Sequence, residues 1–290
     1  MQKCWLFAIM MMMKKIPSYA KINLGLKVSG KHEGLHILDM VSTSISLCDD
    51  VNISFNDSGT ITTNFSDRSI DDNNNTVTKA CQLVREHVVF GADIFIKKNI
   101  PMEAGLGGGS GNAATVLNVL EEKFELSNRG VNLLRIAKQV GSDVPSMLTN
   151  GFKRVGGTGE EVEKIESNMK LNLLLVKGKK GVSTRECFGK YATHNEQCTM
   201  IDNLILAIKT NDLNSLIQNI HNDLTAPAIF LVPEISDHIE LIKKHGSIIS
   251  FMTGSGSTCV GIFETMGIAM QAEKEISKLG LWAKACFTTL

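Results

Sequence analysis

The stretch Pro101-Met102-Glu103-Ala104-Gly105-Leu106-Gly107-Gly108-Gly109-Ser110-Gly111-Asn112-Ala113-Ala114 is the most informative part of this chain. Glycine fills five of the seven positions from 105 to 111. Apolar residues then recur at helical spacing up to Phe124, which predicts an amphipathic helix with one buried face. Before the glycines, residues 92–97 alternate and predict a strand, with Ile94 and Ile96 on one side. The order of strand, glycine-rich loop and helix start presents backbone N–H groups and the positive end of a helix dipole to an anion.

A linker, a Walker A loop and a dinucleotide fingerprint each fit this segment less well. A flexible linker would be richer in serine and would not lie between a patterned strand and a patterned helix. A Walker A loop requires Gly-Lys-Ser/Thr, which does not follow here, and the spacing of Gly105, Gly107 and Gly109 differs from that of a dinucleotide fingerprint. The loop therefore predicts a phosphate site for a nucleotide.

Composition narrows the class of protein. The 290 residues are enough for two domains of ordinary size. Thirty basic residues balance thirty acidic ones, which argues against a nucleic-acid or anionic membrane partner. The seven cysteines form no C-x-x-C pair, so we expect reduced thiols in a cytoplasmic protein and neither a disulfide framework nor a zinc site.

The N-terminus carries an apolar run from Cys4 to Met13. This run is too short to span a bilayer, and no small-x-small cleavage site follows it. We expect Met13 to be the true start and residues 1–12 to be an upstream extension.

Periodicity predicts a mixed α+β first half and a second half of different order. The first half has strands up to about residue 64, a helix at 76–87, the strand at 92–97, the helix after the glycines, a helix that ends at Gly141 as a C′ glycine, and a short helix after Asp143. The second half has strands at 171–176, 248–252, 258–263 and 282–288, with helices at 202–209, 213–220, 234–245 and 267–278. Without the additional helices, the second half reads β-α-β-β-α-β, the ferredoxin-like pattern.

Two further segments resemble known motifs when taken with the central loop. They are Pro17-Ser18-Tyr19-Ala20-Lys21-Ile22-Asn23-Leu24-Gly25-Leu26-Lys27-Val28 and Gly254-Ser255-Gly256-Ser257. Together the three segments resemble the three motifs of the GHMP kinase superfamily. Gly141-Ser142-Asp143-Val144-Pro145 and Gly157-Thr158-Gly159-Glu160 also fit, and the resemblance runs in order from about Met13 to the end.

The resemblance implies a fold and an activity. The fold is a two-domain α+β GHMP kinase fold, with an ATP-binding domain at residues 13–162 and a ferredoxin-like domain that contributes to substrate binding at 163–290. The activity is ATP-dependent, Mg²⁺-dependent phosphorylation of the 2-hydroxyl of 4-(cytidine 5'-diphospho)-2-C-methyl-D-erythritol, in non-mevalonate isoprenoid synthesis. The implied partner is a small molecule with a CDP moiety, and we expect a monomer or weak homodimer.

The resemblance also assigns two catalytic residues. From local sequence alone, Asp143 before Val144-Pro145 is a good helix N-cap. The resemblance instead makes it the base that accepts the proton of the substrate hydroxyl. Alternation places Lys21 on one face of its strand with Tyr19 and Asn23, where it is either an outward-facing strand lysine or, by the resemblance, the neighbour of the base that stabilises the developing alkoxide.

The binding residues implied by the resemblance fall into two sets. The ATP set is Pro101, Met102, Ala104, Gly105, Leu106, Gly107, Gly108, Gly109, Ser110 and Asn112, with Ser110 also reaching Mg²⁺ and Asn112 supporting the loop. The substrate set is Asn23, His36, Thr184, Phe188, Gly254, Ser255 and Gly256. Two positions depart from the family pattern: Leu35 replaces a tyrosine before His36, and Gly111 replaces a serine.

Two other functions remain open at this point. One is another GHMP kinase that acts on mevalonate or homoserine, against which the Gly-x-Asp-Val-Pro segment argues. The other is a ligand sensor that kept the fold and lost catalysis. The presence of both Lys21 and Asp143 favours an enzyme, because a non-catalytic relative need not keep the pair.

Overall fold

The computed structural model describes residues 15–32, 34–191 and 200–290. The predicted start at Met13 and the extension before it lie outside these residues. The chain forms two compact units built from interleaved segments: unit 1 comprises residues up to 19, 48–100 and 108–148, and unit 2 comprises residues 20–47, 101–107 and 149–290. The sequential boundary between residues 162 and 163 stays a prediction.

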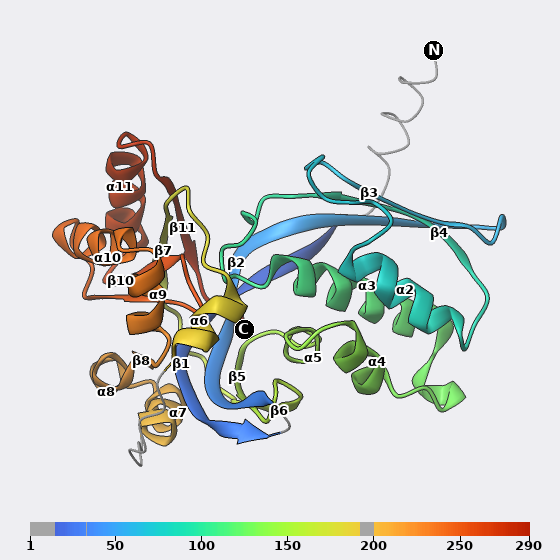
Figure 1. Cartoon of the computed structure of the whole chain (residues 1–290), viewed down its shortest axis with the longest axis horizontal. Helices are drawn as coiled ribbons and strands as arrows, with labels where there is room; N and C mark the ends of the chain where they lie inside the picture. Colours follow the sequence, from blue (N-terminus) through green and yellow to red (C-terminus); the bar gives the residue numbers. More distant parts are fainter. Residues whose placement is uncertain (1–14, 33, 192–199) are drawn as a thin grey trace. The chain divides into compact units, whose positions relative to one another are not determined.

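Unit 1 contains a small sheet covered by helices (Figure 1). Strand β4 (Gly91–Lys97) lies in the middle, pairing antiparallel with the second half of β2 (Leu35–Asn56) and parallel with β3 (Ile61–Phe65). The helices are α2 (Thr76–Arg85), α3 (Gly108–Phe124), α4 (Leu133–Val140) and α5 (Val144–Met147), with a 3₁₀ turn η1 (Ser127–Arg129). Apolar side chains from the strands and helices form one core.

The four helices of unit 1 lie where the sequence predicts, although α2 ends at Arg85 and not at residue 87. The face of α3 that periodicity marks as apolar is fully buried at Ala113, Val116, Leu117 and Leu120. Helix α4 ends at Gly141 as predicted, but the φ of 179° at this glycine is extended backbone and not the left-handed conformation typical of a C′ glycine. The chain turns there directly into α5, with the Val144 N–H donating to the Gly141 carbonyl at 3.2 Å.

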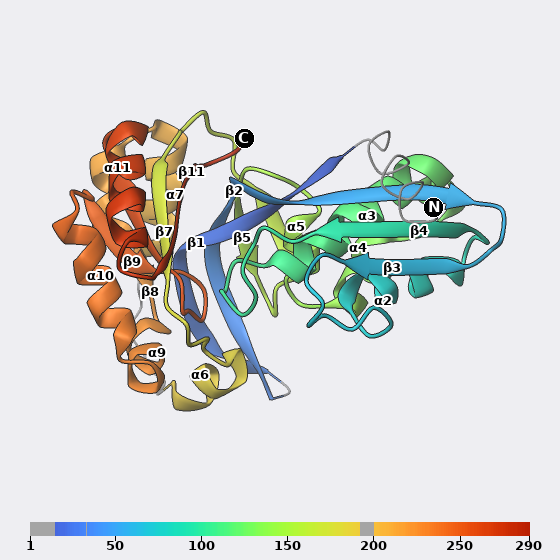
Figure 2. The same cartoon turned by 90° about the horizontal axis from the view of Figure 1, so that it is seen from above.

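Unit 2 contains a four-stranded antiparallel sheet in the order β11 (Trp282–Phe287), β7 (Asn172–Lys177), β10 (Cys259–Phe263), β9 (Ile249–Met252). Helices α10 (Glu234–Lys244) and α11 (Met266–Ser277) lie along this sheet (Figure 2). The chain order β7, α10, β9, β10, α11, β11 is the ferredoxin-like order that the sequence predicts. The two-domain α+β fold class is thereby confirmed.

The rest of unit 2 includes the later part of one long strand and the first half of another. Strand β1 (Ile16–His32) pairs in parallel with the short β8 (His221–Asn222), and β2 pairs with the hairpin of β5 (Phe152–Gly156) and β6 (Glu161–Lys164). Helices α7 (Met200–Thr210) and α8 (Leu213–Asn219) pack together, as do α6 (Thr184–Lys190) and α9 (Thr225–Leu231). Among the described residues, no helix is long and apolar enough to cross a membrane.

Candidate active site

The glycine-rich loop, residues 101–107, follows β4 and leads into α3. Its backbone takes positive φ at Glu103, Gly105 and Gly107, with values of 50°, 71° and 70°. Gly105 is also in close contact with other backbone, since a Cβ on it would lie 2.8 Å from the Gly256 carbonyl oxygen. Glycine is therefore required at position 105 for two independent reasons, its φ and its surroundings.

A second glycine turn, residues 253–258, contacts this loop within unit 2. Gly254 and Gly256 have φ of 60° and 85°, and a Cβ on Gly254 would lie 3.1 Å from the Gly105 oxygen. The Thr258 hydroxyl donates to the Ala104 carbonyl at 2.6 Å. The two turns thus fix each other's backbone although they lie far apart in the sequence.

Lys21 lies next to this pair of turns. Its N–H donates to the Leu106 carbonyl at 3.0 Å, and its ammonium donates to Asn23 Oδ1 at 2.8 Å. The Asn23 N–H donates in turn to the Thr253 hydroxyl at 2.7 Å. The predicted shared face of Lys21 and Asn23 is therefore present, and a cation, an amide and two glycine turns meet in one place.

Lys153 is a charged residue that sequence reasoning missed. It belongs to β5, is only 2% exposed, and donates from its ammonium to the Thr149 carbonyl. Burial, followed by the charge of Lys21, lowers the pKa of Lys153 to about 8. A lysine in an otherwise ordinary strand segment gives no sign of this burial, so its sequence carries no usable signal.

Asp143 occupies the N-cap position of α5, in unit 1. Its φ of −85° and ψ of −15° are helical, and its side chain makes no capping hydrogen bond to the helix. The Ser146 hydroxyl instead donates to the Asp143 backbone carbonyl at 2.9 Å. The interpretation of this carboxylate as a helix cap is therefore wrong, while its role as a base stays a prediction.

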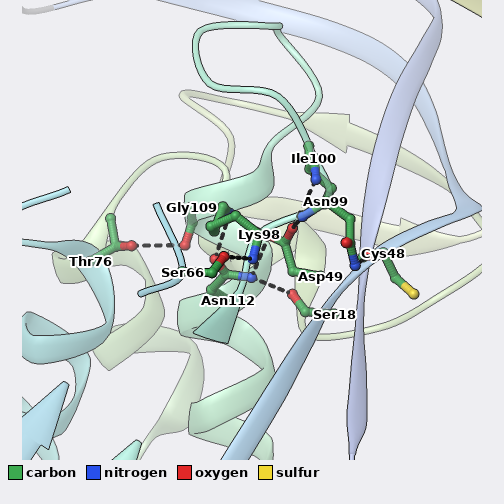
Figure 3. Close-up of polar contacts among 10 residues, drawn as sticks. All are labelled: Ser18, Cys48, Asp49, Ser66, Thr76, Lys98, Asn99, Ile100, Gly109 and Asn112. Carbon is green, nitrogen blue, oxygen red and sulfur yellow. Dashed lines mark hydrogen bonds and ion pairs between the residues drawn. The ribbon is translucent and has the colours of Figure 1, made fainter. Parts of the chain in front are cut away.

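The first turn of α3 presents the remaining predicted phosphate ligands. Gly108, Gly109 and Ser110 form this turn, and Gly109 is exposed. The Thr76 hydroxyl donates to the Gly109 carbonyl at 2.8 Å (Figure 3). Gly111 is packed tightly, since a Cβ there would lie 3.0 Å from the Tyr19 carbonyl oxygen. The departure from serine at position 111 thus goes with a closely packed helix.

Asn112 lies in a buried cluster of polar side chains in unit 1. It is 1% exposed, and its amide nitrogen donates to Ser18 Oγ at 3.0 Å and to Asp49 Oδ2 at 2.9 Å. Its amide oxygen accepts from the Lys98 ammonium at 2.9 Å. Figure 3 shows this buried group of side chains beneath the start of α3. The geometry favours the supporting part of the prediction for Asn112 over direct contact with ATP.

An aromatic cluster lies in unit 2. The rings of His36 and Phe188 are stacked with centroids 4.8 Å apart, and Tyr191 meets His36 edge-on at 6.4 Å. Burial, followed by the charge of Lys31, lowers the pKa of His36 and favours the neutral ring. A base placed between two rings needs about 7 Å between them, twice an ordinary contact distance. His36 and Phe188 therefore form a closed stack here and not an open sandwich.

Polar groups connect this cluster to the second glycine turn. Thr184, in the unpredicted helix α6, and Ser255 share a hydrogen bond of 2.8 Å. A cavity of about 810 Å³ has Tyr191, Lys27 and Asn222 in its lining. The Asn222 amide donates to the Gly254 carbonyl at 2.8 Å. Short chains of contacts thus connect the predicted substrate residues of unit 2. Met102, from the predicted ATP set, is 47% exposed in the glycine-rich loop.

Comparison with known proteins identifies the family of this chain. Models of the GHMP kinase N-terminal domain and the GHMP kinase C-terminal domain match residues 75–151 and 204–280. The 4-diphosphocytidyl-2-C-methyl-D-erythritol kinase of Prochlorococcus marinus (strain MIT 9301) is 35% identical over 272 residues, covering 88% of this chain and 87% of that protein. The protein of the same name from Rhizobium etli (strain CIAT 652) is 34% identical over 259 residues, covering 87% and 86%.

Solved structures extend the comparison. A crystal structure of 4-(cytidine 5'-diphospho)-2C-methyl-D-erythritol kinase matches with a TM-score of 0.79 at 25% identity, over 96% of this chain and all of that one. Homoserine kinase from Cytophaga hutchinsonii matches with a TM-score of 0.71 at 17% identity, over 96% of both chains, and shows the fold alone. From its sequence, its two units and these matches, the chain belongs to the GHMP kinases, a family of ATP-using phosphotransferases.

Proposed function

We propose that this chain transfers the γ-phosphoryl group of ATP to the 2-hydroxyl of 4-(cytidine 5'-diphospho)-2-C-methyl-D-erythritol. The similarity to kinases of that name over nearly nine-tenths of the chain supports this substrate. The observation that carries the proposal is the stacked pair of His36 and Phe188, which lies in the same unit as Lys21 and both glycine turns. An aromatic side chain offers stacking to a nucleobase, and mevalonate and homoserine have no base to stack.

The proposed chemistry follows from the residue types. Phosphoryl transfer requires positioning and charge stabilisation more than covalent help from the protein. The glycine turns offer backbone N–H groups to the phosphates. Asp143 accepts the proton of the attacking hydroxyl, and the Lys21 ammonium, held by Asn23, stabilises the developing negative charge.

The aromatic pair adds a condition to cytosine binding. The 4.8 Å separation of the two rings leaves no room for a base between them. Cytosine stacking on Phe188 therefore requires His36 to move off that ring. His36 Nδ1 is buried and has no hydrogen-bond partner among the described residues, so a polar ligand atom would satisfy it.

Magnesium belongs to the proposal through the nucleotide. Among the described residues, no group of three or more His, Cys, Asp or Glu side chains could hold a metal ion. Mg²⁺ commonly binds through substrate phosphates with few protein ligands, so the Ser110 hydroxyl at the start of α3 fits that role. When bound, the ion neutralises phosphate charge during transfer.

We place this small-molecule kinase in the cytoplasm as a monomer or weak homodimer, without a nucleic-acid or membrane partner.

One assay tests the proposal against its alternatives. Purified protein is incubated with ATP and Mg²⁺, and ADP release is measured with the CDP-linked substrate, mevalonate or homoserine as acceptor. We expect turnover only with the CDP-linked substrate. Turnover with mevalonate or homoserine would assign another GHMP kinase activity, and ATP binding without turnover on any of the three would favour a ligand sensor.

A further inference from the structure

We propose that Asp49 is a positioning residue for nucleotide binding, acting on both ends of the glycine-rich loop. The inference rests on the proposed function, because it takes that loop to be the ATP site. It adds a residue that the sequence motifs do not select. Asp49 lies within β2 and is completely buried.

The Asp49 carboxylate accepts hydrogen bonds from both segments of chain that border the loop (Figure 3). Oδ1 accepts from the backbone N–H groups of Asn99 at 2.7 Å and Ile100 at 2.9 Å. Oδ2 accepts from the Asn112 amide at 2.9 Å and forms an ion pair with Lys98. Four donors therefore converge on one buried carboxylate. An uncharged side chain of the same size cannot accept hydrogen bonds from all four donors in the same way.

These donors stand at the entry and the exit of the loop. Ile100 directly precedes Pro101, the first loop residue, and Asn112 lies in the second turn of α3, just after the glycines. Since all of these donors and Asp49 itself belong to unit 1, their contacts do not depend on how the two units are arranged. One carboxylate thus fixes the separation between the two points where the loop begins and ends.

Lys98 extends this control to the helix start. A Cβ placed on Gly108, the first residue of α3, would lie 3.4 Å from the Lys98 ammonium and 3.1 Å from Ile100 Cγ2. The ammonium therefore lies directly beneath the helix N-terminus, where the dipole already favours an anion. Its position is set by Asp49 and by Asn112, which accepts from it at 2.9 Å.

The expected consequence is selective for the nucleotide. A loop whose ends are loosened must be ordered at the moment of binding, which costs conformational entropy and weakens ATP. The residues proposed to bind the acceptor belong to unit 2, so we expect the acceptor to be affected much less. Loss of one charge-assisted hydrogen bond implies about tenfold to hundredfold weaker nucleotide binding.

The experiment compares Asp49→Asn with the double variant Asp49→Asn/Lys98→Met, which also removes the buried ammonium left by the first change. Asp93→Asn is the matched control, since Asp93 is an exposed carboxylate of unit 1 that bonds Asn56 and Thr62. For each protein, calorimetry gives the Kd of a non-hydrolysable ATP analogue, steady-state kinetics gives KM for both substrates and kcat, and thermal melting reports folding.

We expect both Asp49 variants to raise the nucleotide Kd and KM about tenfold to hundredfold, while the acceptor KM stays within about twofold and Asp93→Asn matches the wild type. Unchanged nucleotide affinity in a folded variant, or equal losses for nucleotide and acceptor, would overturn the proposal. If the carboxylate variants do not fold, Asn112→Ala decides in the same way, because it removes one donor and keeps the ion pair. Failure of the wild type to bind ATP would count against the proposed function instead.

Discussion

Lys98 and Lys153 are both buried lysines, and their surroundings differ. In unit 1, Lys98 is paired with the Asp49 carboxylate and the Asn112 amide. In unit 2, Lys153 lies near a second ammonium, and burial with the Lys21 charge lowers its pKa to about 8. The first region fixes the backbone around the glycine loop by balancing charge. The second gathers positive charge where phosphoryl chemistry is proposed, and burial, followed by the nearby charge of Lys21, lowers the pKa of its lysine.

The largest expected effect tests the chemical side of this comparison. Asp143→Asn should lower kcat by about 10²-fold to 10⁴-fold, the contribution of a general base, while leaving stability nearly unchanged. Lys21→Met should act on the same step, and the double variant should lose less than the product of the two effects. The control is Asn132→Ala at α4, a true cap whose side chain accepts from Arg135 N–H. That variant should lose about 1 kcal/mol of stability and keep its kcat. A normal kcat in Asp143→Asn would remove the base from the mechanism.

Lys98→Met tests the balanced region. It leaves the Asp49 carboxylate buried without its ammonium, which should lower the free energy of unfolding by about 3–5 kcal/mol. Adding Asp49→Asn should recover part of this loss, because the unpaired charge is then gone. Chemical denaturation at pH 7 measures both. If Lys98→Met alone is as stable as the wild type, this ion pair contributes nothing to the stability of the fold.

Lys153→Met should change stability in the opposite direction and raise the free energy of unfolding. The pKa of Lys153 falls from 10.5 in the unfolded chain to about 8 in the folded protein, so the charged form is disfavoured by folding. The resulting destabilisation is fully present below pH 8 and is relieved as the pH rises to 10.5. The stability advantage of Lys153→Met should therefore shrink by about 3 kcal/mol over that window. Lys164→Met, at a lysine 57% exposed, should show no such trend, and a pH-independent gap for Lys153→Met would contradict the lowered pKa.

Two glycines with similar φ allow the stability cost of backbone strain to be distinguished from the cost of crowding. Gly105 and Gly130 have φ of 71° and 78°. A Cβ added to Gly105 would have other atoms within 4 Å, whereas a Cβ added to Gly130 would have none. Gly130→Ala should cost about 1–2 kcal/mol of stability from its left-handed backbone alone. Gly105→Ala should cost more and should also weaken ATP. Equal melting temperatures for the two variants would show that the loop yields to the extra methyl group.

The last expected effect concerns the aromatic pair. Phe188→Ala should raise the KM of the CDP-linked substrate about 5-fold to 150-fold with little change in kcat, because base stacking is worth about 1–3 kcal/mol and is remote from the reacting hydroxyl. Displacement of His36 before stacking favours the lower end of this range. Phe230→Ala, at a ring 71% exposed in the same unit, serves as control. An unmoved KM would reject the cytosine assignment and leave the kinase family intact.

Patterns of local sequence suffice for most of the fold. Helical spacing locates α3, α4 and α11, and alternation places Ala20, Ile22 and Leu24 in the core, where each is fully buried. The helices α6 and α9 escape prediction because α6 has only two adjacent apolar residues and α9 is apolar along most of its length. Neither shows the spaced apolar residues that reveal α8, which is equally long. A signal for α6 is present, since Ser183 and Glu186 have the spacing of a capping box and the Ser183 side chain does accept from the Glu186 N–H.

The residues of the candidate site also fall into two groups, those that the sequence can identify and those that it cannot. Lys21, Asn23 and the glycine turns carry recognisable motifs, so sequence can select them. Asp49 and Lys153 have no motif, because their importance comes from burial and from partners far along the chain. Asn112 and Asp49 are separated by 63 positions. Only the fold brings such residues together.

The contact between the two glycine turns has a consequence for protein synthesis. The Thr258 hydroxyl that bonds Ala104 belongs to a residue 154 positions later in the chain. At about 5–20 residues per second, a ribosome needs about 8–30 seconds to make that interval. The glycine-rich loop is therefore translated long before the segment that shapes it, whereas the contacts of Asp49 are complete once α3 has emerged. A nascent or prematurely terminated chain carries the proposed phosphate-binding sequence without its finished conformation, so we expect nucleotide binding only after the segment around Thr258 has been made.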